Sequence, residues 1–135
     1  MKQLDQVTKA TIVVCLLGVL LHVYAALFKS DGSQLDLSGI AFLFGLGLWS
    51  CLPYAIWASV AVWRSQPKPA VGAAIGTLAF DCYIHYCVFI APTGSTAAIA
   101  LLFAPLWNLV VIGPLSAAVS WPVLHISTKR RQKAP

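Results

Sequence analysis

Four long stretches of the sequence carry almost no charged residue, and they limit the possible folds more than any other feature. They span residues 10–28, 37–63, 70–91 and 97–126, and Asp81 is the only acidic residue within them. A helix needs about 20 residues to cross the hydrocarbon core of a bilayer, which is about 30 Å thick. We therefore expect an all-α integral membrane protein. Its four transmembrane helices form an antiparallel bundle, which is a single domain over residues 1–135.

The composition excludes the common soluble classes. Hydrophobic residues make up 59% of the chain and charged residues 10%, and the mean hydropathy is +0.82. Soluble domains are about 25% charged. So few charged side chains cannot cover the surface of a cytosolic domain, and so apolar a chain does not stay disordered. A net charge of +5 would also suit a nucleic-acid-binding protein. The positions of the basic residues give a different explanation.

The basic residues lie almost entirely on one side of the expected spans. That side holds Lys2, Lys9, Arg64, Lys68, Lys129, Arg130, Arg131 and Lys133, whereas the other side holds only Lys29. Connections rich in lysine and arginine stay in the cytoplasm. We therefore expect both termini in the cytoplasm and a multi-pass position in the bacterial inner membrane. The expected partners are the lipid bilayer and a membrane protein or a second copy of this chain, and not nucleic acid.

Prolines interrupt the second and fourth stretches. Pro53 lies in the second, and Pro105, Pro114 and Pro122 lie in the fourth. Each proline removes one backbone hydrogen bond and pushes against the carbonyl four residues earlier. Two interpretations stay open: simple kinks in over-long helices, or a broken-helix binding site of the kind found in transporters. Gly113-Pro114 is the position that best fits the second interpretation.

Small residues indicate where membrane helices pack closely. Gly18 belongs to a stripe on one face of the first helix, formed by Thr11, Cys15, Gly18, His22 and Ala25, and the third helix carries Gly72-x-x-x-Gly76. We expect Gly18, Gly72 and Gly76 to form helix-packing interfaces. Gly72 and Gly76 lie nearly opposite Asp81 around the helix. One chain satisfies both faces only if the third helix contacts several others. Otherwise the glycine face binds a partner.

Asp81 is the most informative polar residue, because an acid near the middle of a span is costly unless it is paired or neutral. Thr77 and His85 lie one turn before and after it on the same helix face. His22 and His85 each lie six residues from the outer end of their helix, or about 9 Å deep. Asn108 lies near the level of Asp81. These five residues form the expected intramembrane polar cluster.

The cluster has three interpretations. It is a hydrogen-bond network that fixes helix partners, a site that handles a proton or a ligand, or a metal or haem site. The sequence contains no glutamate and no H-E-x-x-H, Walker or G-x-S-x-G motif. We therefore expect no catalytic residue, no bound metal and no cofactor, and a protein that is not an enzyme.

Three functional hypotheses follow. The first is a small non-enzymatic interaction protein of the inner membrane, either an accessory subunit of a membrane complex or an immunity-type protein. The packing signals on several helix faces favour it. The second is a small oligomeric transporter or channel component that uses Asp81 and His85. The third is a redox subunit that binds haem or a quinone, which the pair His22 and His85 favours.

Overall fold

The computed structural model describes residues 5–28, 36–63, 67–92 and 99–132, with side chains described up to residue 123. Every element within these ranges is helical: α1 (Gln6–Phe28), α2 (Leu37–Trp63), α3 (Pro67–Phe89), α4 (Ile99–Trp107), the π-helical turn η2 (Asn108–Ile112) and α5 (Gly113–Gln132). Four stretches are long and apolar enough to cross a membrane: α1, α2, α3 and the continuous run Ile99–Val123. The expectations of an all-helical chain and four spans are confirmed. Length and composition indicate a multi-pass membrane protein.

Two helices begin earlier than the sequence predicts. The first begins at Gln6 instead of residue 10, because the Asp5 carboxylate caps it by accepting a hydrogen bond of 2.6 Å from the Thr8 N–H. The third begins at Pro67 instead of residue 70. Two prolines, Pro67 and Pro69, lie in its first turn and do not break the helix. Proline fits the first turn, where its missing N–H has no partner within the helix.

The fourth span is one continuous path with an irregular middle. In η2 the Gly113 N–H donates to the Asn108 carbonyl, five residues back instead of four. This wider turn directly precedes Pro114, which has no N–H to donate. The irregularity therefore lies next to Gly113-Pro114, the position that best fits a broken-helix site in the sequence. The helix then continues to Gln132, beyond the expected end at residue 126. The expected start at residue 97 lies outside the described residues.

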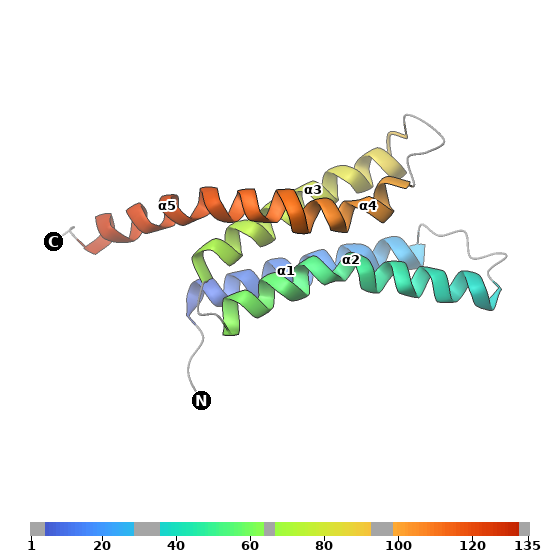
Figure 1. The fold of residues 1–135 in the computed structure, drawn as a ribbon, viewed down its shortest axis with the longest axis horizontal. Helices are drawn as coiled ribbons and strands as arrows, with labels where there is room; N and C mark the ends of the chain where they lie inside the picture. The colour runs from blue at the N-terminus through green and yellow to red at the C-terminus, as the bar shows by residue number, and fades with distance from the viewer. Residues whose placement is uncertain (1–4, 29–35, 64–66, 93–98, 133–135) are drawn as a thin grey trace.

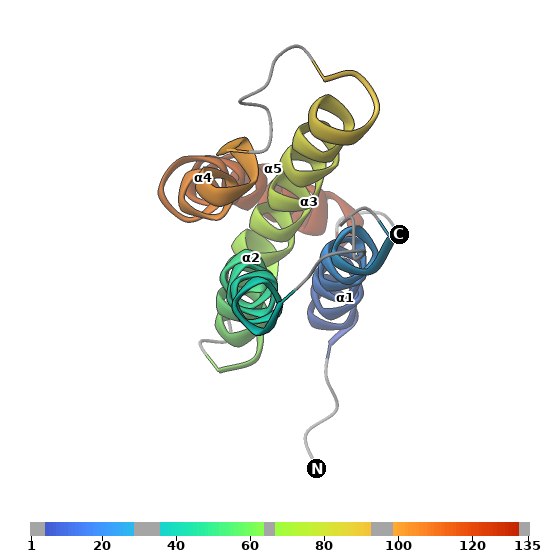
Figure 2. The same ribbon diagram turned by 90° about the vertical axis from the view of Figure 1, so that its right-hand side faces the viewer.

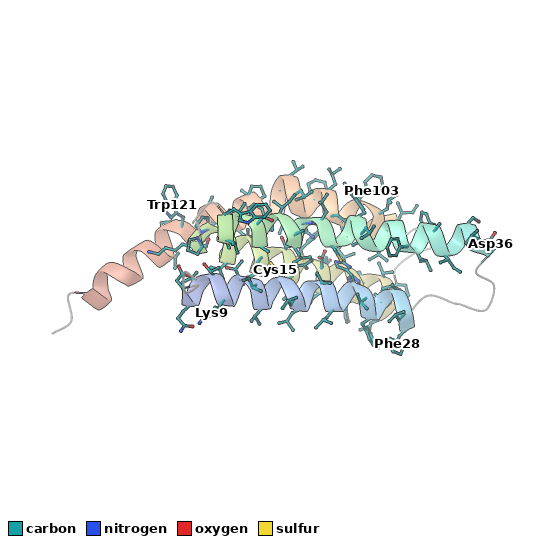
Figure 3. All side chains as sticks on the ribbon, turned by 90° about the horizontal axis from the view of Figure 1, so that it is seen from below. Lys9, Cys15, Phe28, Asp36, Phe103 and Trp121 are labelled. Atoms are coloured by element: carbon teal, nitrogen blue, oxygen red, sulfur yellow. The ribbon has the colours of Figure 1, made fainter. Side chains whose placement is uncertain are left out.

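The four spans alternate in direction, and α3 crosses the middle of the group (Figures 1 and 2). It contacts α1, α2, α4, η2 and α5. We call the end where α1 and α3 stop the Phe28 end, and the end where α2 stops the Trp63 end. The start of α1 and the end of α5 both lie toward the Trp63 end. The first turns of α2 extend past the last turn of α1, as the labels Asp36 and Phe28 show (Figure 3).

The buried side chains are mostly small or polar, whereas many of the exposed side chains are large and apolar. The buried polar residues are Thr8, Thr11, His22, Ser50, Thr77, Asp81, His85 and Asn108, and alanines make up most of the buried apolar set. Long apolar side chains point outward along the helices (Figure 3). This arrangement suits helices whose outer faces contact lipid and whose inner faces need polar partners.

The glycines allow close helix contacts within the chain. A Cβ atom at Gly72 would collide with Ser120 of α5, and one at Gly76 would collide with Ser116 of α5. α5 therefore covers the glycine face of α3 within the chain, so this face does not need a partner protein to cover it. A Cβ atom at Gly18 would collide with the ring of Tyr54, so Gly18 brings α1 against α2.

Candidate functional site

Asp81 lies in the middle of α3 and is 1% exposed. Its carboxylate contacts three other elements of the fold. The Tyr54 hydroxyl of α2 donates to Oδ2 at 2.7 Å, and the Asn108 amide of η2 donates to Oδ1 at 2.7 Å. His22 Nε2 of α1 lies 3.1 Å from Oδ2. The carboxylate thus joins all four spans at one point.

Tyr54 is the member of this site that the sequence analysis did not find. It is 1% exposed, and its ring occupies the space opposite Gly18. Counting depth from the start of α2 places Tyr54 far from Asp81, because α2 extends past the other helices at the Phe28 end (Figure 1). The sequence signal that could have identified Tyr54 is a tyrosine within an apolar span together with a glycine, Gly18, in another span. A buried tyrosine hydroxyl needs a hydrogen-bond partner.

His85 joins the cluster through the backbone and not through the Asp81 carboxylate. Its Nδ1 lies 2.8 Å from the carbonyl oxygen of Asp81, one turn earlier. A carbonyl only accepts hydrogen bonds, so Nδ1 carries the proton and Nε2 of neutral His85 is an acceptor. The His85 and His22 rings have centroids 5.1 Å apart. The structure thus brings together the two histidines that the depth comparison places at one level.

Thr77 lies on the same face of α3 but does not reach the carboxylate. It is fully buried, and its hydroxyl has no hydrogen-bond partner among the described residues. Of the five residues that the sequence assigns to the cluster, the structure places His22, Asp81, His85 and Asn108 in contact and Thr77 one turn away.

The Asp81–His22 pair accepts a proton in two positions. With the proton on His22, Nε2–H donates to the carboxylate. With the proton on Asp81, the acid donates to neutral Nε2. Tyr54 donates to the same oxygen that faces His22, whereas Asn108 donates to the other oxygen. A proton shared between Asp81 and His22 therefore leaves the hydrogen bond from Asn108 to Oδ1 in place.

Two cavities adjoin the histidines. A cavity of about 110 Å³ is lined by His22, Ser50, His85, Phe89 and Leu101, among others. A water molecule needs only about 10–15 Å³ of such space, so this cavity has room for several. A larger groove of about 520 Å³ runs between α1 and α2, and His22 is the one histidine in a wall that is otherwise almost entirely apolar.

The described residues contain no group of three or more histidine, cysteine, aspartate or glutamate side chains that could hold a metal ion. Comparisons with protein-family models, with curated proteins and with solved structures found no match. The function therefore has to be argued from the geometry of the site.

Proposed function

We propose that this chain is a small, non-enzymatic component of a proton-handling transport or channel assembly in the bacterial inner membrane. Asp81 binds and releases the proton together with His22. His85 and the adjoining cavity of about 110 Å³ connect the pair to the Phe28 end. Four helices of this size enclose little volume, so the assembly is expected to include further copies of the chain or another membrane protein.

One observation carries this proposal: a buried carboxylate lies within hydrogen-bond distance of a histidine and accepts from two neutral donors on other helices. Structural hydrogen bonds between membrane helices need no ionisable group, whereas ionisable groups inside membranes mark proton and ion pathways. Tyr54 and Asn108 stabilise the carboxylate form. The neighbouring His22 accepts the proton that the acid form of Asp81 releases.

The orientation of the bundle is part of the proposal. Lys9 and Lys68 lie in the first turns of α1 and α3, which begin at the Trp63 end, so we place this end, and with it both termini, in the cytoplasm. The helices then form an antiparallel bundle with Asp81 between the two membrane surfaces. The cavity beside His22 and His85 lies on the Phe28 side of Asp81, which is then the outer side.

Proton flux into vesicles tests the proposal. The protein, purified with its native partners, is reconstituted into liposomes that contain a pH-sensitive dye, and a potassium diffusion potential drives protons inward. We expect the wild type to exceed empty liposomes and the variant Asp81→Asn to fall to the level of empty liposomes. Asp5→Asn, at the surface, is the matched control and keeps the wild-type rate. Equal flux in wild-type and Asp81→Asn liposomes contradicts the proposal.

A second candidate is quinone binding, which the groove between α1 and α2 favours. Its apolar wall suits an isoprenoid chain, and His22 suits a ring carbonyl that accepts a hydrogen bond. Haem fits less well, because the cavity between the histidines is far below the about 300–1,000 Å³ of ordinary ligand sites. Gly47 lines the groove and has open space beside it. Gly47→Phe should lower the quinone that copurifies with the protein. Absence of quinone from the wild-type preparation contradicts this candidate.

The interaction-protein hypothesis stays a prediction. The glycine face no longer argues for it, because α5 covers that face within the chain. An accessory subunit and a proton-handling component are compatible descriptions of one protein. Affinity purification from native membranes distinguishes a chain that binds a defined partner from one that binds only its own copies.

A further inference from the structure

Three buried polar atoms have no hydrogen-bond partner among the described residues. They are Nε1 of Trp57, Oγ1 of Thr77 and Oδ1 of Asn108. Thr77 and Asn108 are 0% exposed. An unpartnered polar atom in a protein interior is unfavourable, and it is more so within a membrane, where bulk water cannot reach it. Each of the three atoms therefore needs an explanation.

Thr77 and Trp57 lie in one layer, about one turn from Asp81 on the side of the Trp63 end, and Asn108 contacts Asp81 itself. Thr77 precedes Asp81 by about one turn of α3. Trp57 follows Tyr54, which donates a hydrogen bond to Asp81, by about one turn of α2. Because α2 and α3 run in opposite directions, both residues are displaced toward the same end (Figure 1). Asn108 donates its Nδ2 to Asp81, so its Oδ1 lies beside the carboxylate.

The indole of Trp57 lies directly against the turn that carries Asn108. A Cβ atom built on Gly113 would be 2.9 Å from Cε2 of Trp57 and 2.6 Å from the backbone oxygen of Asn108. Cε2 is bonded to Nε1, so the unpartnered N–H of Trp57 lies beside η2. Trp57 and Leu78, the neighbour of Thr77, also pack against the same buried cluster around Tyr54. α2, α3 and η2 thus meet at this layer.

The chemistry of the three atoms selects one kind of ligand. The indole N–H only donates, the amide oxygen only accepts, and the threonine hydroxyl does both. A cation would be opposed by the indole N–H, and an anion by the amide oxygen. A neutral molecule that both donates and accepts satisfies all three. Buried waters in proteins typically make about three such hydrogen bonds.

We infer that a water molecule is bound between Trp57, Thr77 and Asn108, on the Trp63 side of Asp81. The water accepts from the indole, donates to the Asn108 oxygen and shares a hydrogen bond with Thr77. By holding this oxygen it fixes the orientation of the amide, so that Nδ2 points at Asp81. Trp57 and Thr77 are positioning residues for Asn108. This inference does not depend on the proton function.

The sign of the stability change in Thr77→Val tests the inference. Valine has nearly the shape of threonine but no hydroxyl. If Thr77 binds water, the melting temperature in detergent falls. If the hydroxyl is truly unpartnered, its removal raises the melting temperature, and that result overturns the inference, as does an unchanged value. Thr11→Val is the matched control, because Thr11 is also fully buried but donates to the Val7 carbonyl at 2.9 Å. Its melting temperature should fall.

A second measurement asks whether Trp57 and Thr77 hold the same water. Thr77→Val should lower the melting temperature less in a Trp57→Phe background than in the wild type, and equal losses overturn the shared site. Infrared spectra in H₂¹⁸O should show an isotope-shifted O–H band in the wild type that disappears in Thr77→Val. Its persistence there contradicts the inference. If Thr77→Val does not fold, Thr77→Ser should keep the band and Thr77→Ala should lose it.

Discussion

Asp81 is tolerated in an apolar span because each of the other three spans delivers a hydrogen-bond partner to its carboxyl group. Tyr54, Asn108 and His22 come from three different elements, and each lies within 3.1 Å of a carboxylate oxygen. Breaking one such contact leaves the acid less well compensated in a medium of low dielectric constant. The stability of the bundle and the charge state of Asp81 are therefore linked.

Removing the Tyr54 hydroxyl should destabilise the folded protein. We expect Tyr54→Phe to lower the free energy of unfolding by about 1–2 kcal/mol, since Asp81 loses one donor while the ring still fills the space beside Gly18. Unfolding in mixed micelles by a denaturing detergent measures this. Tyr86→Phe is the control, because Tyr86 is 52% exposed, and it should change stability little. Equal stabilities of the two variants would contradict the assigned hydrogen bond.

The carboxylate that caps α1 should make the stability of the protein depend on pH. The Thr8 N–H lowers the pKa of Asp5, so this cap stabilises the fold above the ordinary value of about 3.9 and is lost as the pH falls through the lowered pKa. Asp5→Ala should cost about 0.5–1 kcal/mol at pH 7. Thermal unfolding against pH should show this difference shrinking in acid. Asp5→Asn, which caps without titrating, should keep a constant difference from Asp5→Ala.

At the scale of the elements, the number of spans follows directly from the sequence, but several boundaries do not. Charge-free length predicts four membrane helices, and α2 has the expected bounds, residues 37–63. The start of α1 depends on a cap at Asp5, and the start of α3 depends on prolines that fit a first turn. The π-helical turn η2 could not be predicted from Pro114 alone, because it begins at Asn108, whose side chain is held by its hydrogen bond to Asp81. A hydropathy profile predicts neither the cap at Asp5 nor the first-turn prolines of α3 nor the π-helical turn.

The packing of α3 on α5 should be sensitive to a single methyl group. We expect Gly76→Ala to destabilise the protein by about 1–3 kcal/mol, because the new Cβ would overlap Ser116. Gly45→Ala is the matched control, since a Cβ there meets nothing within 4 Å. It should be neutral or stabilise α2 by up to about 1 kcal/mol through helix propensity. The prediction fails if both substitutions have the same effect on unfolding.

At the scale of the molecule, matching depths predicts which polar residues can meet, but not every contact. His22 meets His85, and Asn108 meets Asp81, because spans of similar length bring side chains of equal depth together. Depth counting does not predict the contact between Tyr54 and Asp81, because α2 is longer than its neighbours and is displaced along them (Figure 3). The placement of Gly72 and Gly76 against α5 depends on the order of the helices around α3, which the sequence pattern leaves open.

The proposed orientation of the chain predicts which positions react from which side. In a background without native cysteines, Ser65→Cys should react with a membrane-impermeant maleimide only after the membrane is opened, because the proposed orientation puts the connection between α2 and α3 in the cytoplasm. Ser33→Cys should react in intact cells. Labelling of position 65 but not 33 in intact cells would invert the topology.

The central claim is that Asp81 binds and releases a proton inside the bundle. Infrared difference spectra between alkaline and acidic pH report this directly, because only a protonated carboxylic acid shows its characteristic C=O stretching band. The account predicts a band from a buried acid that is present in the wild type, absent in Asp81→Asn and kept in the surface variant Asp36→Asn. A wild-type band that persists in Asp81→Asn, or no protonation of Asp81 between the two pH values, would contradict the account.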